Sequence, residues 1–97
     1  MSRADVLAAV KPLEGELKRL GFEKLYLFGS VARDEPNPQD VDLLYEAGSE
    51  AGPGFFELTD ALARLEEVLG SRVDLVERER LHQRIRPRVE AELVEIY

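Results

Sequence analysis

Residues 25–47, LYLFGSVARDEPNPQDVDLLYEA, are the part of the sequence that decides the fold. An apolar run ends at Gly29 and Ser30, a loop with two prolines follows, and a second apolar run carries Asp40 and Asp42 at its start. Short apolar runs bounded by turn residues are typical of buried strands. Side chains two residues apart on a strand point to the same side, so the pattern predicts two neighbouring carboxylates on one face of a sheet.

Helices and further strands are predicted on both sides of this stretch. Two sets of apolar residues recur at spacings of three and four, which is the pattern of one face of a helix. The first set is Val6, Val10, Leu13, Leu17 and Leu20, and the second is Phe55, Leu58, Leu62, Leu65 and Leu69. Strands are predicted at 24–29, 40–47 and 72–77, and an edge strand at 92–97.

Residues that favour helix ends flank both periodic segments. Ser2 and Asp5 suit a cap at the start of the first helix, and Gly21 and Gly70 follow the last apolar residues of the two helices. Pro12 lies inside the first pattern, so either the helix kinks there or two short helices meet there.

A third helix is indicated near the C-terminus by apolar residues spaced four apart. Leu81, Ile85 and Val89 share one face, and the helix is expected to be interrupted or to end near Pro87. The resulting order, α-β-β-α-β-α with a last edge strand, predicts an α/β (α+β) fold. We expect one domain over residues 1–97, with helices packed against a mixed sheet.

The amino-acid composition indicates a small globular domain and excludes several kinds of metal site. The chain has 97 residues, of which 44% are hydrophobic and 34% charged, as expected of a small globular domain. It has no cysteine and a single histidine, His82, which excludes thiolate and multi-histidine metal sites. No apolar run approaches the roughly 20 residues of a membrane helix, and the N-terminus lacks a signal-peptide pattern, so we expect a cytoplasmic protein.

The net charge of −7 narrows the choice of partner. It argues against direct nucleic-acid binding, which depends on neutralising phosphates, and it suits a metal site or a basic protein partner. The alternative is that the acidic surface only keeps the domain in solution. A chain of this size is also compatible with a homo-oligomer, and 93–97 could form a pairing edge.

Three aspartates are candidate metal ligands and catalytic residues. Asp40 and Asp42 repel each other unless a cation lies between them, and oxygen-only ligands suit Mg²⁺ or Mn²⁺. Asp74 lies in the later strand and joins them if the two strands pair. Three carboxylates can hold two metal ions for in-line phosphoryl or nucleotidyl transfer. The alternatives are a solvated strand face and, for Asp74, an ion pair with Arg72.

Gly29, Ser30 and Arg33 are candidate phosphate-binding residues. Gly29 allows backbone to approach a phosphate closely, and Ser30 can bind a phosphate oxygen or cap the short helix that follows. Arg33 lies one turn further along and can reach the same phosphates, or form a surface ion pair.

These motifs together resemble the DNA-polymerase-β-like nucleotidyltransferase superfamily. The resemblance rests on GSVAR, the nine residues that separate Ser30 from Asp40, DVDL and the later VDLV, and it covers nearly the whole chain. The small size is similar to the minimal nucleotidyltransferase (MNT) family. The resemblance implies that Asp40 and Asp42 bind the metal ions that hold ATP, and that Asp74 completes the site and helps to deprotonate the acceptor. It assigns Gly29 and Ser30 to the β- and γ-phosphates.

The sequence departs from the family pattern at two positions. Asp34 replaces the glycine that usually follows the arginine, which is expected to add a negative charge near the triphosphate. Gln39 replaces the serine that often precedes the first aspartate, and the spacer is one residue shorter. The charge of Asp34 is expected to weaken triphosphate binding, whereas the shorter loop is within the range of the wider superfamily. The metal site is expected to be intact.

The resemblance also implies a partner. Minimal nucleotidyltransferases are commonly encoded beside a HEPN-domain protein, and such pairs act as toxin and antitoxin, with AMP transferred from ATP to a tyrosine of the toxin. Two alternatives are a weak or inactive antitoxin that neutralises its partner by binding alone, and a nucleotidyltransferase acting on a small molecule such as an aminoglycoside.

The remaining aromatic and basic residues are assigned to structural roles. His82 is expected at the surface, and four aromatic side chains are expected in the core: Tyr26, Phe28, Phe55 and Phe56. Residues 78–88 contain five arginines. This segment is expected to be a solvated helix face, with a basic patch near the triphosphate or a partner surface as the alternatives.

Overall fold

The computed structural model describes residues 1–36, 40–49 and 51–97, and its elements follow the predicted alternation of helices and strands. In chain order they are α1 (Arg3–Val10), the 3₁₀ helix η1 (Lys11–Leu13), α2 (Glu14–Arg19), β1 (Phe22–Phe28), α3 (Gly29–Ala32), β2 (Val41–Ala47), α4 (Phe55–Leu69), β3 (Val73–Glu77), the 3₁₀ helix η2 (Arg78–Arg80), α5 (Arg86–Ala91) and β4 (Val94–Glu95). The predicted α/β (α+β) architecture is confirmed.

The strands form one mixed sheet in the order β3-β2-β1-β4. β1 pairs antiparallel with both β2 and β4, whereas β2 and β3 are parallel because α4 carries the chain back between them. The predicted tail strand is confirmed as an edge strand, although β4 is only two residues long. The parallel pair sets Asp42 directly beside Asp74.

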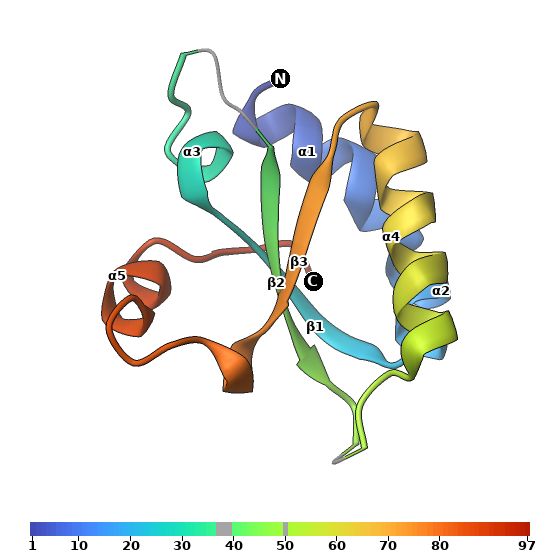
Figure 1. Cartoon of the computed structure of the whole chain (residues 1–97). Coiled ribbons are helices and arrows are strands. Elements are labelled where there is room, and N and C mark those ends of the chain that lie inside the picture. The colour runs from blue at the N-terminus through green and yellow to red at the C-terminus, as the bar shows by residue number, and fades with distance from the viewer. Residues whose placement is uncertain (37–39, 50) are drawn as a thin grey trace.

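The two faces of the sheet are covered unequally (Figure 1). Helices α1, α2 and α4 lie on one side, over the main core, and α5 lies on the other side. Val41 and Leu43 face the main core with exposed fractions of 1% and 0%. Leu44 faces α5 and packs with Leu81 and Val89. The strand alternation therefore directs Asp42 towards the α5 side.

The helix ends follow from local sequence. Ser2 and Asp5 form the predicted capping box of α1, with each side chain accepting a hydrogen bond from the other residue's N–H. At Pro12 the chain forms η1, so two short helices meet there. Gly21 has a φ of +110°, and Gly70, the C-cap of α4, has a φ of +62°, conformations that favour glycine.

Pro87 starts a helix rather than ending one, which corrects the prediction for the third helix. The residues before it form η2 and a turn, and α5 begins at Arg86 with the proline in its first turn. The first N–H groups of a helix have no partner within it, so proline costs nothing there. His82 is exposed, as predicted.

The prediction that Phe55 and Phe56 belong to the core is wrong. Their exposed fractions are 74% and 75%, because both lie in the first turn of α4, before the helix reaches the core at Leu58. Tyr26 and Phe28 do pack against the smaller cluster under α5. No helix in the described residues is both long and apolar enough to cross a membrane.

Candidate active site

Gly29 joins the end of β1 to α3 in a conformation that only glycine adopts without strain. Its φ is +80°, and a Cβ atom built there would collide with the Asp42 carboxylate. The absence of a side chain therefore allows the carboxylate to lie directly against the backbone. The glycine of the predicted phosphate loop and an aspartate of the predicted metal site are thus in contact.

Most of the predicted site residues line a single cavity of about 360 Å³. Asp40 immediately precedes β2 and Asp42 is its second residue, and both line this cavity together with Gly29 and Ser30. The remaining lining residues lie at the end of β1, just after α3, and in or beside α5: Phe28, Arg33, Ile85, Arg88, Val89 and Glu92. We call this space the aspartate cavity.

Asp74 lies beside this cavity and does not line it. It is exposed on β3, in register with Asp42 across the parallel pair, so the predicted pairing of the two strands is confirmed. In the part of the chain that the structure describes, Asp74 forms no ion pair within 4.0 Å, so the alternative of a salt bridge to Arg72 does not occur.

The environment of Asp42 disfavours its negative charge. Partial burial raises the pKa of the Asp42 carboxyl above its ordinary value, and the nearby charges of Asp74 and Asp40 raise it further. Arg33 opposes this shift only in part. A cation close to the three carboxylates would offset the electrostatic repulsion among them.

The donor set has the chemistry of a hard divalent cation. All three side chains offer carboxylate oxygens, which suit Mg²⁺ and Mn²⁺, and within the described residues none of the three is neutralised by a lysine or arginine. Within residues 1–36, 40–49 and 51–97, the structure contains no group of three histidine, cysteine or acidic side chains that could together bind a metal ion. Asp40 and Asp42, which share the cavity, are the residues that would hold one.

Glu92 is a site residue that the sequence did not reveal. Its carboxylate accepts a hydrogen bond from the N–H of Gly29 at 3.1 Å and from Nη1 of Arg33 at 2.8 Å. It thus connects the first residue of α3 to the residue that follows the helix. Arg33 also contacts Glu35 at 2.7 Å, and these two carboxylates raise its pKa. Glu92 is 63 residues from Gly29 in a strongly acidic chain, so no local pattern distinguishes it.

Asp34 contacts the start of α1 and does not line the aspartate cavity. Its φ of +52° is left-handed, which aspartate tolerates better than most residues and glycine tolerates best. One carboxylate oxygen accepts a hydrogen bond from the N–H of Arg3 at 2.9 Å, and Asp34 does not line the cavity. Asp34, which stands where the family usually has glycine, is therefore stabilised by this hydrogen bond to the first residue of α1. Gln39, the other departure, lies outside the described residues.

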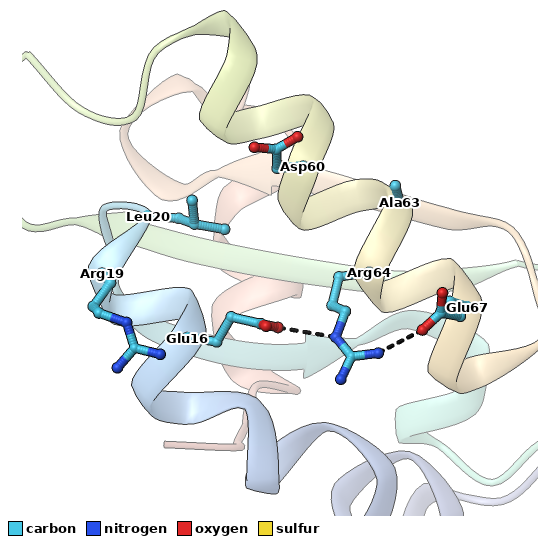
Figure 2. Close-up of a pocket in the computed structure, with 7 residues that line it drawn as sticks. All are labelled: Glu16, Arg19, Leu20, Asp60, Ala63, Arg64 and Glu67. Atoms are coloured by element: carbon cyan, nitrogen blue, oxygen red, sulfur yellow. Dashed lines mark hydrogen bonds and ion pairs between the residues drawn. The ribbon is translucent and has the colours of Figure 1, made fainter.

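A second cavity, of about 430 Å³, lies between α2 and α4 (Figure 2). It is lined by Glu16, Arg19, Leu20, Asp60, Ala63, Arg64 and Glu67. Arg64 spans it with ion pairs to Glu16 and Glu67 (Figure 2). None of the predicted site residues lines it, and its central cation is already neutralised. The predicted site residues therefore lie at the aspartate cavity, although that space is smaller.

Comparison with known proteins identifies the family of the chain. A family model described as a nucleotidyltransferase domain matches residues 10–96. A provisionally named protein adenylyltransferase of Methanocaldococcus jannaschii is 33% identical over 81 residues, which are 82% of this chain and 85% of that protein. A solved structure of a provisionally named minimal nucleotidyltransferase is 31% identical, with a TM-score of 0.78 over 97% of this chain and 95% of that chain.

A more distant structure shares the fold. It is a tri-AMPylated HEPN toxin of Shewanella oneidensis in complex with an MNT antitoxin, with 20% identity and a TM-score of 0.57 over 90% of this chain and 71% of that chain. At this identity the likeness shows the fold alone. From the family model and the two nearer relatives, the chain belongs to the nucleotidyltransferase domain family, in its minimal nucleotidyltransferase branch, and is a nucleotidyltransferase.

Proposed function

We propose that this nucleotidyltransferase transfers AMP from ATP to a tyrosine hydroxyl of a HEPN-domain toxin, in a reaction that depends on Mg²⁺ or Mn²⁺. The chain would then be the antitoxin of a toxin–antitoxin pair. The observation that carries the proposal is a single cavity lined by Asp40 and Asp42 together with Gly29 and Ser30. Carboxylates for metal ions and backbone for phosphate are what nucleotidyl transfer requires.

The reaction breaks one phosphorus–oxygen bond and forms another. The acceptor hydroxyl attacks the α-phosphorus of ATP, the bond to the bridging oxygen breaks, and pyrophosphate leaves. Asp40 and Asp42 would hold the metal ions, which when bound neutralise phosphate charge and orient the attacking and leaving oxygens. The exposure of Asp74 beside Asp42 supports a role in taking the proton of the incoming hydroxyl.

The two residues of the Gly-Ser pair have different roles in this proposal. The N–H of Gly29 already donates to Glu92, so Gly29 contributes the close approach of backbone to phosphate and to Asp42. Ser30 lines the cavity and would supply the polar contact to the β- and γ-phosphates. The helix α3 has only 4 residues, and neither of these roles depends on a longer helix.

A protein acceptor is supported by the relatives. The Methanocaldococcus jannaschii relative is named a protein adenylyltransferase, and the Shewanella oneidensis complex contains an AMPylated HEPN toxin. The net charge of −7 would favour association with a basic partner. We propose that residues 1–97 act as one nucleotidyltransferase domain in the cytoplasm, where ATP is the AMP donor.

Co-expression with the product of the adjacent gene, which we propose to be the HEPN protein, tests the proposal. Intact mass spectrometry of the HEPN protein should show added AMP units with the native chain and none with Asp40→Asn or Asp42→Asn. Asp60→Asn, which removes an exposed carboxylate from α4, is the matched control and should leave the modification intact. Full modification by Asp42→Asn would overturn the metal-site assignment.

An antitoxin that works by binding alone is the second candidate. The observation that favours it is that the three aspartates do not converge on one point among the described residues. In that case the HEPN protein would co-purify in a tight complex without added mass. The same experiment therefore separates the two candidates.

A further inference from the structure

The arginines of the basic segment at residues 78–88 differ in whether a carboxylate neutralises them. Arg78 contacts Glu46 at 3.1 Å and Glu90 at 2.9 Å, and Arg86 shares Glu90 at 3.4 Å. Arg80 is paired in the same way, at 3.0 Å from a glutamate oxygen. Arg84 and Arg88 have no ion pair among the residues that the structure describes.

Of the five, Arg88 alone lines the aspartate cavity, as far as the described residues show. Its neighbour Val89 is 3% exposed and packs with Leu44 and Leu81 under the sheet. Pro87 restricts the backbone on the other side. The main chain at Arg88 is therefore held in place while its exposed side chain remains adjustable beside the cavity.

The other arginine of this cavity is already engaged. Arg33 is held by Glu35 and by Glu92, and Glu92 also accepts from Gly29. Its charge is thus largely offset before any ligand binds, and its contacts fix the turn at α3. The ionic lining that remains is Asp40 and Asp42, which repel phosphate unless a metal ion is bound, and Arg88, which attracts it.

We propose that Arg88 binds the β- and γ-phosphates of the nucleoside triphosphate, while Arg33 is a positioning residue that braces the Gly29 turn through Glu92. This inference rests on the proposed function. A guanidinium offers several N–H donors in one plane and suits phosphate oxygens. The assignment gives the basic segment one specific role at the site, while its three paired arginines, Arg78, Arg80 and Arg86, form ion pairs within the fold.

Ligand binding to the full chain by isothermal titration calorimetry tests the proposal. The probes are the Mg²⁺ complex of a non-hydrolysable ATP analogue, Mg²⁺-pyrophosphate and adenosine. Arg88→Ala should weaken binding of the ATP analogue and of pyrophosphate by about tenfold, which is typical of one lost charge-assisted contact. Adenosine affinity should not change. Arg88→Lys, which keeps the charge, should recover part of the loss.

Arg84→Ala is the matched control, because it removes the same charge from the same segment outside the cavity lining. It should bind both phosphate ligands like the native chain. Native-like affinity of Arg88→Ala, or an equal loss in both variants, would overturn the role of Arg88. So would a loss for the ATP analogue without one for pyrophosphate. A native chain that binds neither ligand would instead overturn the proposed function and the inference with it.

Discussion

The contact between Gly29 and Asp42 links the two halves of the site at the level of single residues. A left-handed φ and the lack of a side chain at Gly29 leave the space that the Asp42 carboxylate occupies. The pairing of β1 with β2 brings them together, since Phe28 is the register partner of Asp42. A change at either residue is therefore expected to affect both phosphate and metal binding.

Gly29→Ala should lower both stability and nucleotide affinity. An alanine in the left-handed region costs about 1 kcal/mol, and displacement of Asp42 should bring the total to about 2–3 kcal/mol. Gly70→Ala is the control, because its φ is +62° but no atom lies within 4 Å of the added Cβ. Urea denaturation should show the larger loss at position 29. Equal losses of unfolding free energy at positions 29 and 70 would mean that Asp42 can move away from the added Cβ atom without destabilising the fold.

Asp42→Asn should stabilise the metal-free protein at neutral pH. The folded-state pKa of Asp42 is raised, so its ionised form is less favourable in the folded chain than in the unfolded chain. Removing the charge should add about 0.5 kcal/mol at pH 7, the scale of a like-charged pair on adjacent strands. The gain should shrink as the pH falls through the folded-state pKa, because the native carboxyl then takes up a proton.

Unfolding curves of Asp42→Asn and the native chain between about pH 7 and pH 4 measure this difference. The exposed Asp60→Asn serves as the control and should show no comparable gain. A variant less stable than the native chain throughout this range would show that the Asp42 carboxylate is favourable in the metal-free fold.

At the level of elements, long-range hydrogen bonds hold both ends of the short helix α3. Glu92, after α5, contacts Gly29 and Arg33. At the other end, Asp34 accepts from the N–H of Arg3, and the Arg3 side chain donates to the carbonyl of Ala32 at 2.8 Å. A helix of 4 residues cannot be stable by itself, so these contacts must fix its position.

Asp34 substitutions should separate its backbone role from its charge. Asp34→Asn keeps a side chain that tolerates the left-handed region and can accept from Arg3, so stability should change by less than about 0.5 kcal/mol. Asp34→Ala loses both features and should cost about 1–2 kcal/mol. Thermal or urea unfolding measures both changes.

Nucleotide binding gives the second measurement for Asp34. The affinity of Asp34→Asn for Mg²⁺-ATP should equal that of the native chain, because Asp34 does not line the aspartate cavity. A clear gain in affinity would instead support the expectation from sequence that this charge opposes the triphosphate.

At the scale of the whole molecule, the C-terminal segment completes one edge of the sheet and the main core. β4 pairs with β1 at one edge, and Ile96 and Tyr97 are buried in the main core. The Tyr97 hydroxyl donates to the carbonyl of Phe22 at 2.8 Å, across 75 residues of sequence. Burial raises the pKa of this hydroxyl, in keeping with a neutral donor.

Tyr97→Phe should cost about 1 kcal/mol of folding free energy, because it removes a buried hydrogen bond and leaves the Phe22 carbonyl without that donor. Tyr45→Phe is the matched control: Tyr45 is 7% exposed, and its hydroxyl has no hydrogen bond among the described residues. It should be nearly neutral. Equal effects of the two changes in urea denaturation would mean that the Tyr97 bond contributes nothing net.

Much of the fold was predictable because it depends on short-range patterns. The apolar periodicity of α4, the capping box at Ser2 and the alternation along β2 each require only a few neighbouring residues. The failures lie at element boundaries. Phe55 and Phe56 continue an apolar helical pattern but precede the core, and Pro87 begins a helix where an end was predicted. Periodicity gives the face of a helix, whereas burial depends on where the helix lies over the sheet.

The sequence by itself determined the order of the elements, the two aspartates at the start of β2, and the glycine turn before them, because each follows from backbone geometry over a few residues. Only the tertiary structure decided which charges meet. Glu92 reaches Gly29 across 63 residues, and Asp34 turns to Arg3 across 31. An ion pair depends on distances between elements that are far apart in the chain, and these distances are fixed only once the sheet and its helices have packed.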